Sequence, residues 1–111
     1  MLYYDFKAGN REYKLRLNTR NILELEKKLG CNPLMIFGKN GDSVPTVSAM
    51  VTILHASLQA CEHGIKFDDA CNIFDDYIAD GNSAVEFAKV IMEVYKISGI
   101  VPNSVEDSEK N

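Results

Sequence analysis

Residues 10–30 read "NREYKLRLNTRNILELEKKLG", and a change of pattern inside this stretch decides the fold. In its first half apolar and charged residues alternate, with Leu15 and Leu17 on one face, which is typical of a half-buried strand. In its second half apolar residues recur at helical spacing, and Asn18 or Thr19 can cap the helix. The stretch therefore predicts a strand that turns directly into a helix, which ends at the closing glycine.

A second alternating run precedes this strand. Residues 2–7 alternate between apolar and polar positions, and the dipeptide Gly9-Asn10 separates them from residues 11–17. Gly-Asn tolerates the positive φ of a tight turn, so the two runs predict an N-terminal β-hairpin.

The rest of the chain shows helical patterns and stop signals. We expect a short helical turn over 33–37, a strong, centrally placed helix over 46–62, a helix of roughly twelve residues capped by Asp68 and ended by Gly81, and a helix over 84–98 with a Ser83–Glu86 capping box. The expected fold class is α+β, with an N-terminal β-hairpin followed by a small bundle of three main helices plus one short helix.

The length of 111 residues suits a single domain, expected over 1–100, and the polar segment 101–111 is expected to be a disordered tail. No apolar run approaches the ~20 residues of a membrane span, and "MLYYDFKAG" lacks the pattern of a signal peptide. We expect a cytoplasmic protein. The three cysteines form no CxxC pair, which predicts reduced, mostly buried thiols.

Charge is unevenly distributed along the chain. Residues 1–40 hold eight Lys/Arg against four Asp/Glu, whereas residues 41–111 hold four against twelve, giving +4 and −8 and a net charge of −4. Overall acidity argues against a nucleic-acid partner. The asymmetry favours a protein partner or self-association of unlike ends, and the basic candidates for such contacts are Lys14, Arg16 and Arg20.

The acidic candidates are Asp75, Asp76 and Asp80, which we place at the C-terminal end of a helix. The helix dipole disfavours negative charge there, so we interpret them as a docking patch for a basic surface. A calcium loop starting at Asp76 would need oxygen ligands where the chain has Ile78 and Phe87, so the calcium pattern fails.

Patterns for zinc and for catalysis are also missing. Cys61, His63 and Cys71 lack the paired spacing and the fourth ligand of a zinc site, and Cys61 falls on an apolar helix stripe. No GxSxG elbow or phosphate loop occurs, and His55 lies in a polar helix strip. We therefore expect no catalytic residue, no metal and no cofactor.

The helices over 46–62 and 84–98 are apolar on most sides, which leaves two interpretations open. The apolar residues either form a good core or leave a surface for a partner. For the second case we expect partner binding around Val90, Tyr95 and Ile97.

Four segments together carry a family resemblance: "REYKLRLNTRNILELEKKLG", "ILHASLQACEHGI", "DDACNIFDDYIADG" and "VIMEVYKISGI". Their order and spacing over about residues 3–100 resemble the tail assembly chaperones of long-tailed phages and prophages of Gram-positive hosts. The resemblance implies a non-enzymatic protein of the host cytoplasm, absent from the finished virion. Such proteins bind the tape measure protein and keep it soluble while tail tube protein subunits polymerise around it.

The family often makes a longer product by −1 frameshifting. The ending Glu-Lys-Asn can be encoded with the slippery heptamer A AAA AAC, so we hypothesise such a site, which sequencing the gene would test. The alternative function is a small self-associating scaffold or regulatory module of the bacterial cytoplasm. Its basic hairpin would meet the acidic helix end of a neighbouring copy.

Overall fold

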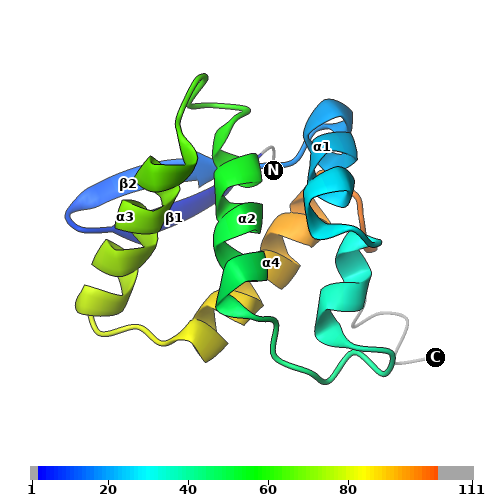
Figure 1. The fold of residues 1–111 in the computed structure, drawn as a ribbon. Helices are drawn as coiled ribbons and strands as arrows, with labels where there is room; N and C mark the ends of the chain where they lie inside the picture. The colour runs from blue at the N-terminus through cyan, green and yellow to red at the C-terminus, as the bar shows by residue number, and fades with distance from the viewer. Residues whose placement is uncertain (1–2, 103–111) are drawn as a thin grey trace.

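In the part of the chain that the structure describes, an antiparallel hairpin is followed by helices (Figure 1). The computed structural model describes residues 3–102, so the predicted disorder of 103–111 and the hypothesised frameshift ending lie outside the described residues. The elements are β1 (Tyr4–Ala8), β2 (Arg11–Leu15), α1 (Thr19–Leu29), a 3-10 helix η1 (Pro33–Phe37), α2 (Val47–Leu58), α3 (Phe67–Ala79) and α4 (Ala84–Ser98). The predicted α+β class is confirmed.

The hairpin has the predicted two-residue turn. Ala8 pairs with Arg11 across it, and Gly9 and Asn10 have φ of 57° and 66°. Positive φ at both central positions gives the backbone twist that matches the flanking strands. The pleat then sends one face of both strands inward, where Phe6, Ala8, Tyr13 and Leu15 are buried.

The change from strand to helix follows from local hydrogen bonds. Leu17 continues the inward face of β2 and its backbone N–H donates to Ser98 Oγ at 2.9 Å. Asn18, one of the two predicted caps, accepts the N–H of Asn21, and the Asn21 side chain accepts the N–H of Asn18. This reciprocal pair satisfies two N–H groups that an uncapped helix leaves free, so α1 starts at once.

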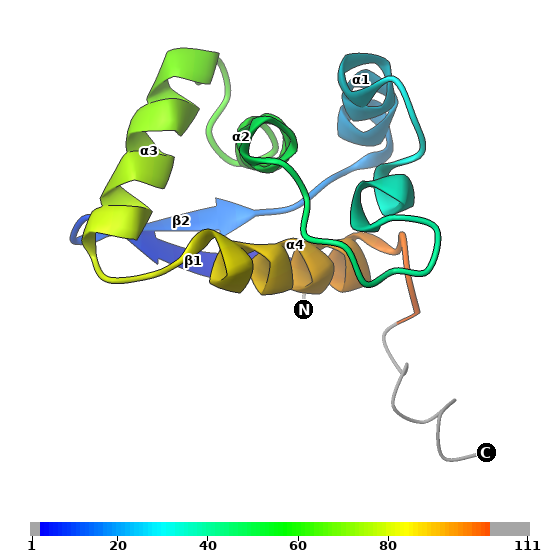
Figure 2. The ribbon, with the colours of Figure 1, turned by 60° about the horizontal axis from the view of Figure 1, so that its bottom comes forward.

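Helix α2 is central, as predicted. Figure 2 shows it end-on between α1 and α3, with α4 and the hairpin beneath. Its buried residues, which explain why it is apolar on most sides, are Met50, Val51, Ile53, Leu54, Ala56, Ser57 and Leu58. The core beside the hairpin is aromatic, with Phe6, Phe74, Tyr77 and Phe87 in contact at centroid separations from 5.0 to 6.4 Å.

Helix α2 ends at Leu58, earlier than the predicted 62. Gln59 donates its side-chain N–H to the Ile65 carbonyl at 3.0 Å, and His55 Nε2 lies 2.9 Å from the same oxygen. These contacts fold residues 59–65 back onto α2. Cys61 therefore leaves the apolar stripe and is exposed, so its predicted burial is wrong.

The other cysteines do not follow the expectation of mostly buried thiols either. Cys31 is exposed directly after the C-terminal glycine of α1, and Cys71 is half-buried. The prediction is wrong because each thiol lies at a helix end or edge rather than in the core.

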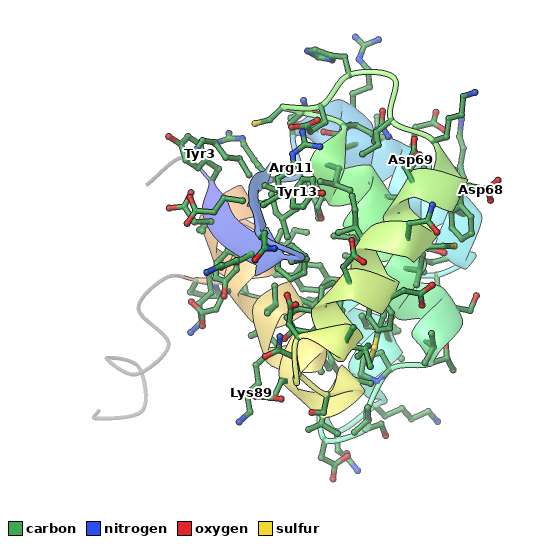
Figure 3. The ribbon with its side chains drawn as sticks, turned by 90° about the vertical axis from the view of Figure 1, so that its left-hand side faces the viewer. Tyr3, Arg11, Tyr13, Asp68, Asp69 and Lys89 are labelled. Carbon is green, nitrogen blue, oxygen red and sulfur yellow. The ribbon has the colours of Figure 1, made fainter. Side chains whose placement is uncertain are left out.

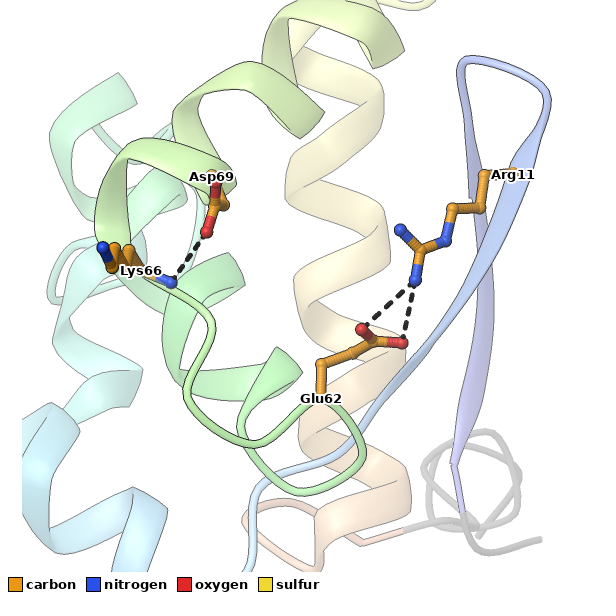
Figure 4. A network of polar contacts seen from close by, with 4 residues as sticks. All are labelled: Arg11, Glu62, Lys66 and Asp69. Carbon is orange, nitrogen blue, oxygen red and sulfur yellow. Dashed lines mark hydrogen bonds and ion pairs between the residues drawn. The ribbon is translucent and has the colours of Figure 1, made fainter.

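The predicted cap of α3 is also wrong. The helix starts at Phe67, one residue before Asp68, and Asp69 accepts the backbone N–H of Lys66 at 3.0 Å (Figure 4). The carboxylate of Asp69 reaches back from the first turn, so Asp68 is left inside the helix on its exposed side.

Among residues 3–102, no helix combines the length and apolar character needed to span a bilayer.

Candidate functional site

The hairpin turn and the acidic end of α3 meet within one chain. The backbone N–H of Gly9 donates to Asp80 Oδ2 at 2.8 Å, although the two residues lie far apart in the sequence. Asp76 also lies against the turn, since a Cβ added at Gly9 would be 2.9 Å from Asp76 Oδ2. Of the carboxylates that the helix dipole disfavours, Asp80 thus has a hydrogen-bond partner inside the molecule.

A second contact joins the hairpin to another segment, the turn after α2. Arg11 Nη2 lies 3.2 Å from Glu62 Oε1, which ties the start of β2 to the turn after α2 (Figure 4). Both side chains are substantially exposed, so this pair contributes roughly 0–1 kcal/mol. Under the alternative function the basic hairpin would meet the acidic helix end of a neighbouring copy, whereas here the hairpin turn contacts Asp80 of that helix end within the same chain.

The predicted basic residues lie on two elements. Lys14 and Arg16 alternate with inward-facing Leu15, whereas Arg20 is exposed on the first turn of α1. Lys14 Nζ lies 3.1 Å from Asp5 Oδ1 and 4.2 Å from the centre of the Tyr3 ring. The hydrogen bond to Asp5 raises the pKa of Lys14 above its ordinary value. This part of the hairpin surface carries charges of both signs.

The predicted apolar flank of α4 is largely inside the core. Val90 is 8% exposed and Tyr95 is 0% exposed, while Ile97 is half-buried. The Tyr95 hydroxyl donates to the Pro33 carbonyl at 3.0 Å, and burial raises the pKa of Tyr95. Val90 and Tyr95 offer a partner almost no exposed surface in this fold, and binding around them stays a prediction. The hairpin covers one flank of α4, and η1 covers the other.

The apolar surface that remains exposed lies elsewhere. Val47 opens α2, Ile78 lies in the last turn of α3 and Val85 lies in the first turn of α4. These three helix ends lie at the same end of the molecule, the lower end in Figure 1, and the segment carrying exposed Val44 leads into it. We call Val44, Val47, Ile78 and Val85 the apolar end surface.

Sequence reasoning missed this surface because it placed the candidate partner surface on the flank of α4 around Val90, Tyr95 and Ile97, not on the first turns of α2 and α4. The first turn of each helix extends past the core. Leu23 and Met35 are also exposed, but they lie on α1 and η1, and exposed Phe67 lies at the opposite end of α3 from Ile78. Phe67 packs edge-on against the His55 ring at 5.8 Å.

Two of the grooves on the described part of the molecule lie beside the hairpin and beside α1. One of about 560 Å³ runs beside β1 and is lined on its far side by Tyr77, Asp80, Asn82 and Val90. The other, of about 460 Å³, lies between α1 and the end of α2 and includes His55. Because His55 holds the 59–65 turn through Nε2, its evident role is structural. Within residues 3–102, no three His, Cys, Asp or Glu side chains are grouped to hold a metal ion.

Comparison with known proteins gives a family but no function. A family model described as a family of unknown function (DUF6096) matches residues 4–111, which is nearly the whole chain. Searches of curated proteins and of solved structures returned no significant match. This chain therefore belongs to the DUF6096 family.

Proposed function

We propose that this protein is a non-enzymatic phage tail assembly chaperone. In this role it binds the tape measure protein in the bacterial cytoplasm, keeps it soluble and helps to recruit tail tube protein subunits. It is absent from the finished virion. The proposal rests on the resemblance of the ordered segments described above and on one structural observation, the apolar end surface.

The apolar end surface supports the proposal because its four side chains are between 39% and 56% exposed and lie on segments at one end of the molecule, where three helices begin or end. Such a surface suits the apolar face of a helical segment, which binds through side chains one turn apart. Acidic residues border it, since Asp75 lies one turn before Ile78 on α3 and is exposed. A tape measure segment with apolar residues flanked by lysine or arginine would therefore fit.

Co-expression tests this proposal. The partner is the longest predicted helical reading frame downstream of the gene, and the measurement is the fraction of that partner in the soluble lysate. We expect this chain to raise the soluble fraction several-fold. The variant Val47→Ser/Val85→Ser should abolish most of the gain, because it removes apolar contact area worth about 1 kcal/mol or more per side chain.

The matched control is Leu23→Ser on α1. Leu23 is 55% exposed, close to the 53% of both Val47 and Val85, but it lies away from the apolar end surface. This variant should retain the gain. No gain with the unaltered chain would reject the chaperone function. An equal gain with both variants would reject the apolar end surface as the binding site.

A further inference from the structure

The outer edge of β1 has unpaired backbone groups. In a hairpin closed by a two-residue turn, the pair next to the turn exchanges both hydrogen bonds and the following pairs alternate. With Ala8 opposite Arg11, the N–H and C=O groups of Asp5 and Lys7 point away from β2. Outside the β1–β2 ladder, no backbone hydrogen bond reaches these groups within residues 3–102.

The two edges of the hairpin differ in this respect. On β2, the backbone N–H just beyond the strand, that of Arg16, donates to the Ser57 carbonyl at 3.0 Å, so α2 covers the far end of this edge. The β1 edge instead borders the 560 Å³ groove, and β1 contains no proline. An open edge of this kind is a template for another strand.

The charged side chains of β1 favour one partner strand, a second β1, and one pairing register. Asp5 and Lys7 lie on the exposed face of β1 with Phe6 between them on the buried face. If a second β1 pairs antiparallel with Phe6 at the centre, each Asp5 lies opposite a Lys7 of the other copy. Two-fold registers shifted by two residues would place Asp5 opposite Asp5, or Lys7 opposite Lys7, and like charges directly opposite are destabilising.

Helix α4 repeats this self-complementarity. Four charged residues lie at helical spacing on one face of this helix, and we call them the α4 charged strip: Glu86, Lys89, Glu93 and Lys96. When two such strips meet antiparallel, Glu86 faces Lys96 of the other copy and Lys89 faces Glu93. Figure 3 shows Lys89 projecting from α4 on the side of the hairpin.

Helix α4, which carries the strip, packs beside β1. Phe6, at the centre of the β1 register, packs against the Phe87 ring of α4 at 5.6 Å, and Val90 lines the groove beside β1. Glu93 lies near enough to Tyr4 to act on its hydroxyl, because its charge adds to burial in raising the pKa of Tyr4. One two-fold axis near Phe6 can therefore serve both pairings.

We infer that the β1 edge and the α4 charged strip form one interface with a second copy of this chain, which creates a four-stranded antiparallel sheet across a two-fold axis. This interface joins like surfaces, unlike the predicted contact between unlike charged ends. It does not depend on the proposed function and does not use the apolar end surface.

Sedimentation velocity over a concentration series tests the inference on the whole chain. The unaltered protein should form dimers, and raised salt should weaken them. Lys89→Glu should raise the dimer dissociation constant about tenfold or more, because it places like charges opposite each other twice. The exchange Lys89→Glu/Glu93→Lys restores opposite charges and should restore the dimer.

Two proline variants test the strand edge. Lys7→Pro removes an outward N–H from β1 without removing a bond of the β1–β2 ladder, and should abolish the dimer. Glu12→Pro is the matched control, because Glu12 is the cross-strand partner of Lys7 and points to the other edge. It should leave the dimer intact. A monomer at all concentrations, or a dimer unaffected by both Lys7→Pro and Lys89→Glu, would overturn the inference.

Discussion

Asp80 lies at the end of α3, where the dipole of the helix disfavours a carboxylate, and yet its Oδ2 accepts the Gly9 N–H at 2.8 Å. The hydrogen bond offsets the unfavourable position. Asp75 lies in the same helix and is exposed. The helix dipole disfavours its charge too, but no comparable contact with the hairpin turn offsets this effect. The two residues have the same side chain, and the contact with the turn distinguishes them.

This difference predicts opposite effects of the same substitution. Asp80→Ala should lower the free energy of unfolding by about 1 kcal/mol, because the turn loses its charge-assisted hydrogen bond. Asp75→Ala should leave the free energy of unfolding unchanged or raise it by roughly a few tenths of a kcal/mol, because it removes an unfavourable charge from the helix end. Urea denaturation of both variants measures the effects. Equal destabilisation would show that the Gly9 contact has no energetic role.

The elements differ in how far local sequence determines them. The turn at Gly9-Asn10 and the Ser83–Glu86 capping box were predicted because each depends on residues within one turn. The end of α2 was not predicted correctly, because the 59–65 segment folds back and forms hydrogen bonds with side chains of the helix end. The burial of Tyr95 was missed for a related reason, since the η1 carbonyl it contacts is distant in sequence.

Helix α1 provides the test at this scale. Asn18→Ala removes a side chain that accepts the Asn21 N–H, so it should lower the free energy of unfolding by about 1 kcal/mol. Thr19→Ala is the control, because Thr19 is the first helical residue and Asn18 holds the cap. It should change stability by less than about 0.5 kcal/mol. Thermal unfolding by circular dichroism compares them, and a larger loss for Thr19→Ala would contradict this assignment of the cap.

In the whole molecule, long-range contacts decide what the charge asymmetry does. The sequence showed a basic first part and an acidic remainder, but it could not show that Gly9 and Arg11 meet Asp80 and Glu62 in the same chain. The same contacts explain why the sequence predicts the fold class well and the candidate site poorly. The helices follow local patterns, whereas the exposed surface depends on which ends extend past the core.

Ionisation of Tyr95 should make the free energy of unfolding depend on pH in the alkaline range. Burial raises its pKa in the folded state above the unfolded value near 10, so its contribution to stability is complete below about pH 9. As the pH rises above about 10, the unfolded state loses the proton first and the free energy of unfolding falls, by up to about 1.4 kcal/mol per pH unit. Tyr95→Phe should cost about 1–2 kcal/mol at neutral pH, because it leaves the Pro33 carbonyl unpaired.

The measurement is the free energy of unfolding of both proteins by urea at a series of pH values. The difference between them should shrink above about pH 10, because only the unaltered chain has this hydroxyl to ionise. A constant difference across the series would mean that Tyr95 ionises equally in both states.

The hydrogen bonds from Gly9 to Asp80 and from Leu17 to Ser98 also set an order of events during synthesis. The hairpin is translated before both of its partners, which lie much later in the sequence. Until α3 and α4 emerge, the aromatic partners of Phe6 on those helices are missing and the inner face of the hairpin is only partly covered. The hairpin is therefore translated before the helices that secure it, and a chain truncated before α4 would expose an aromatic strand surface to aggregation.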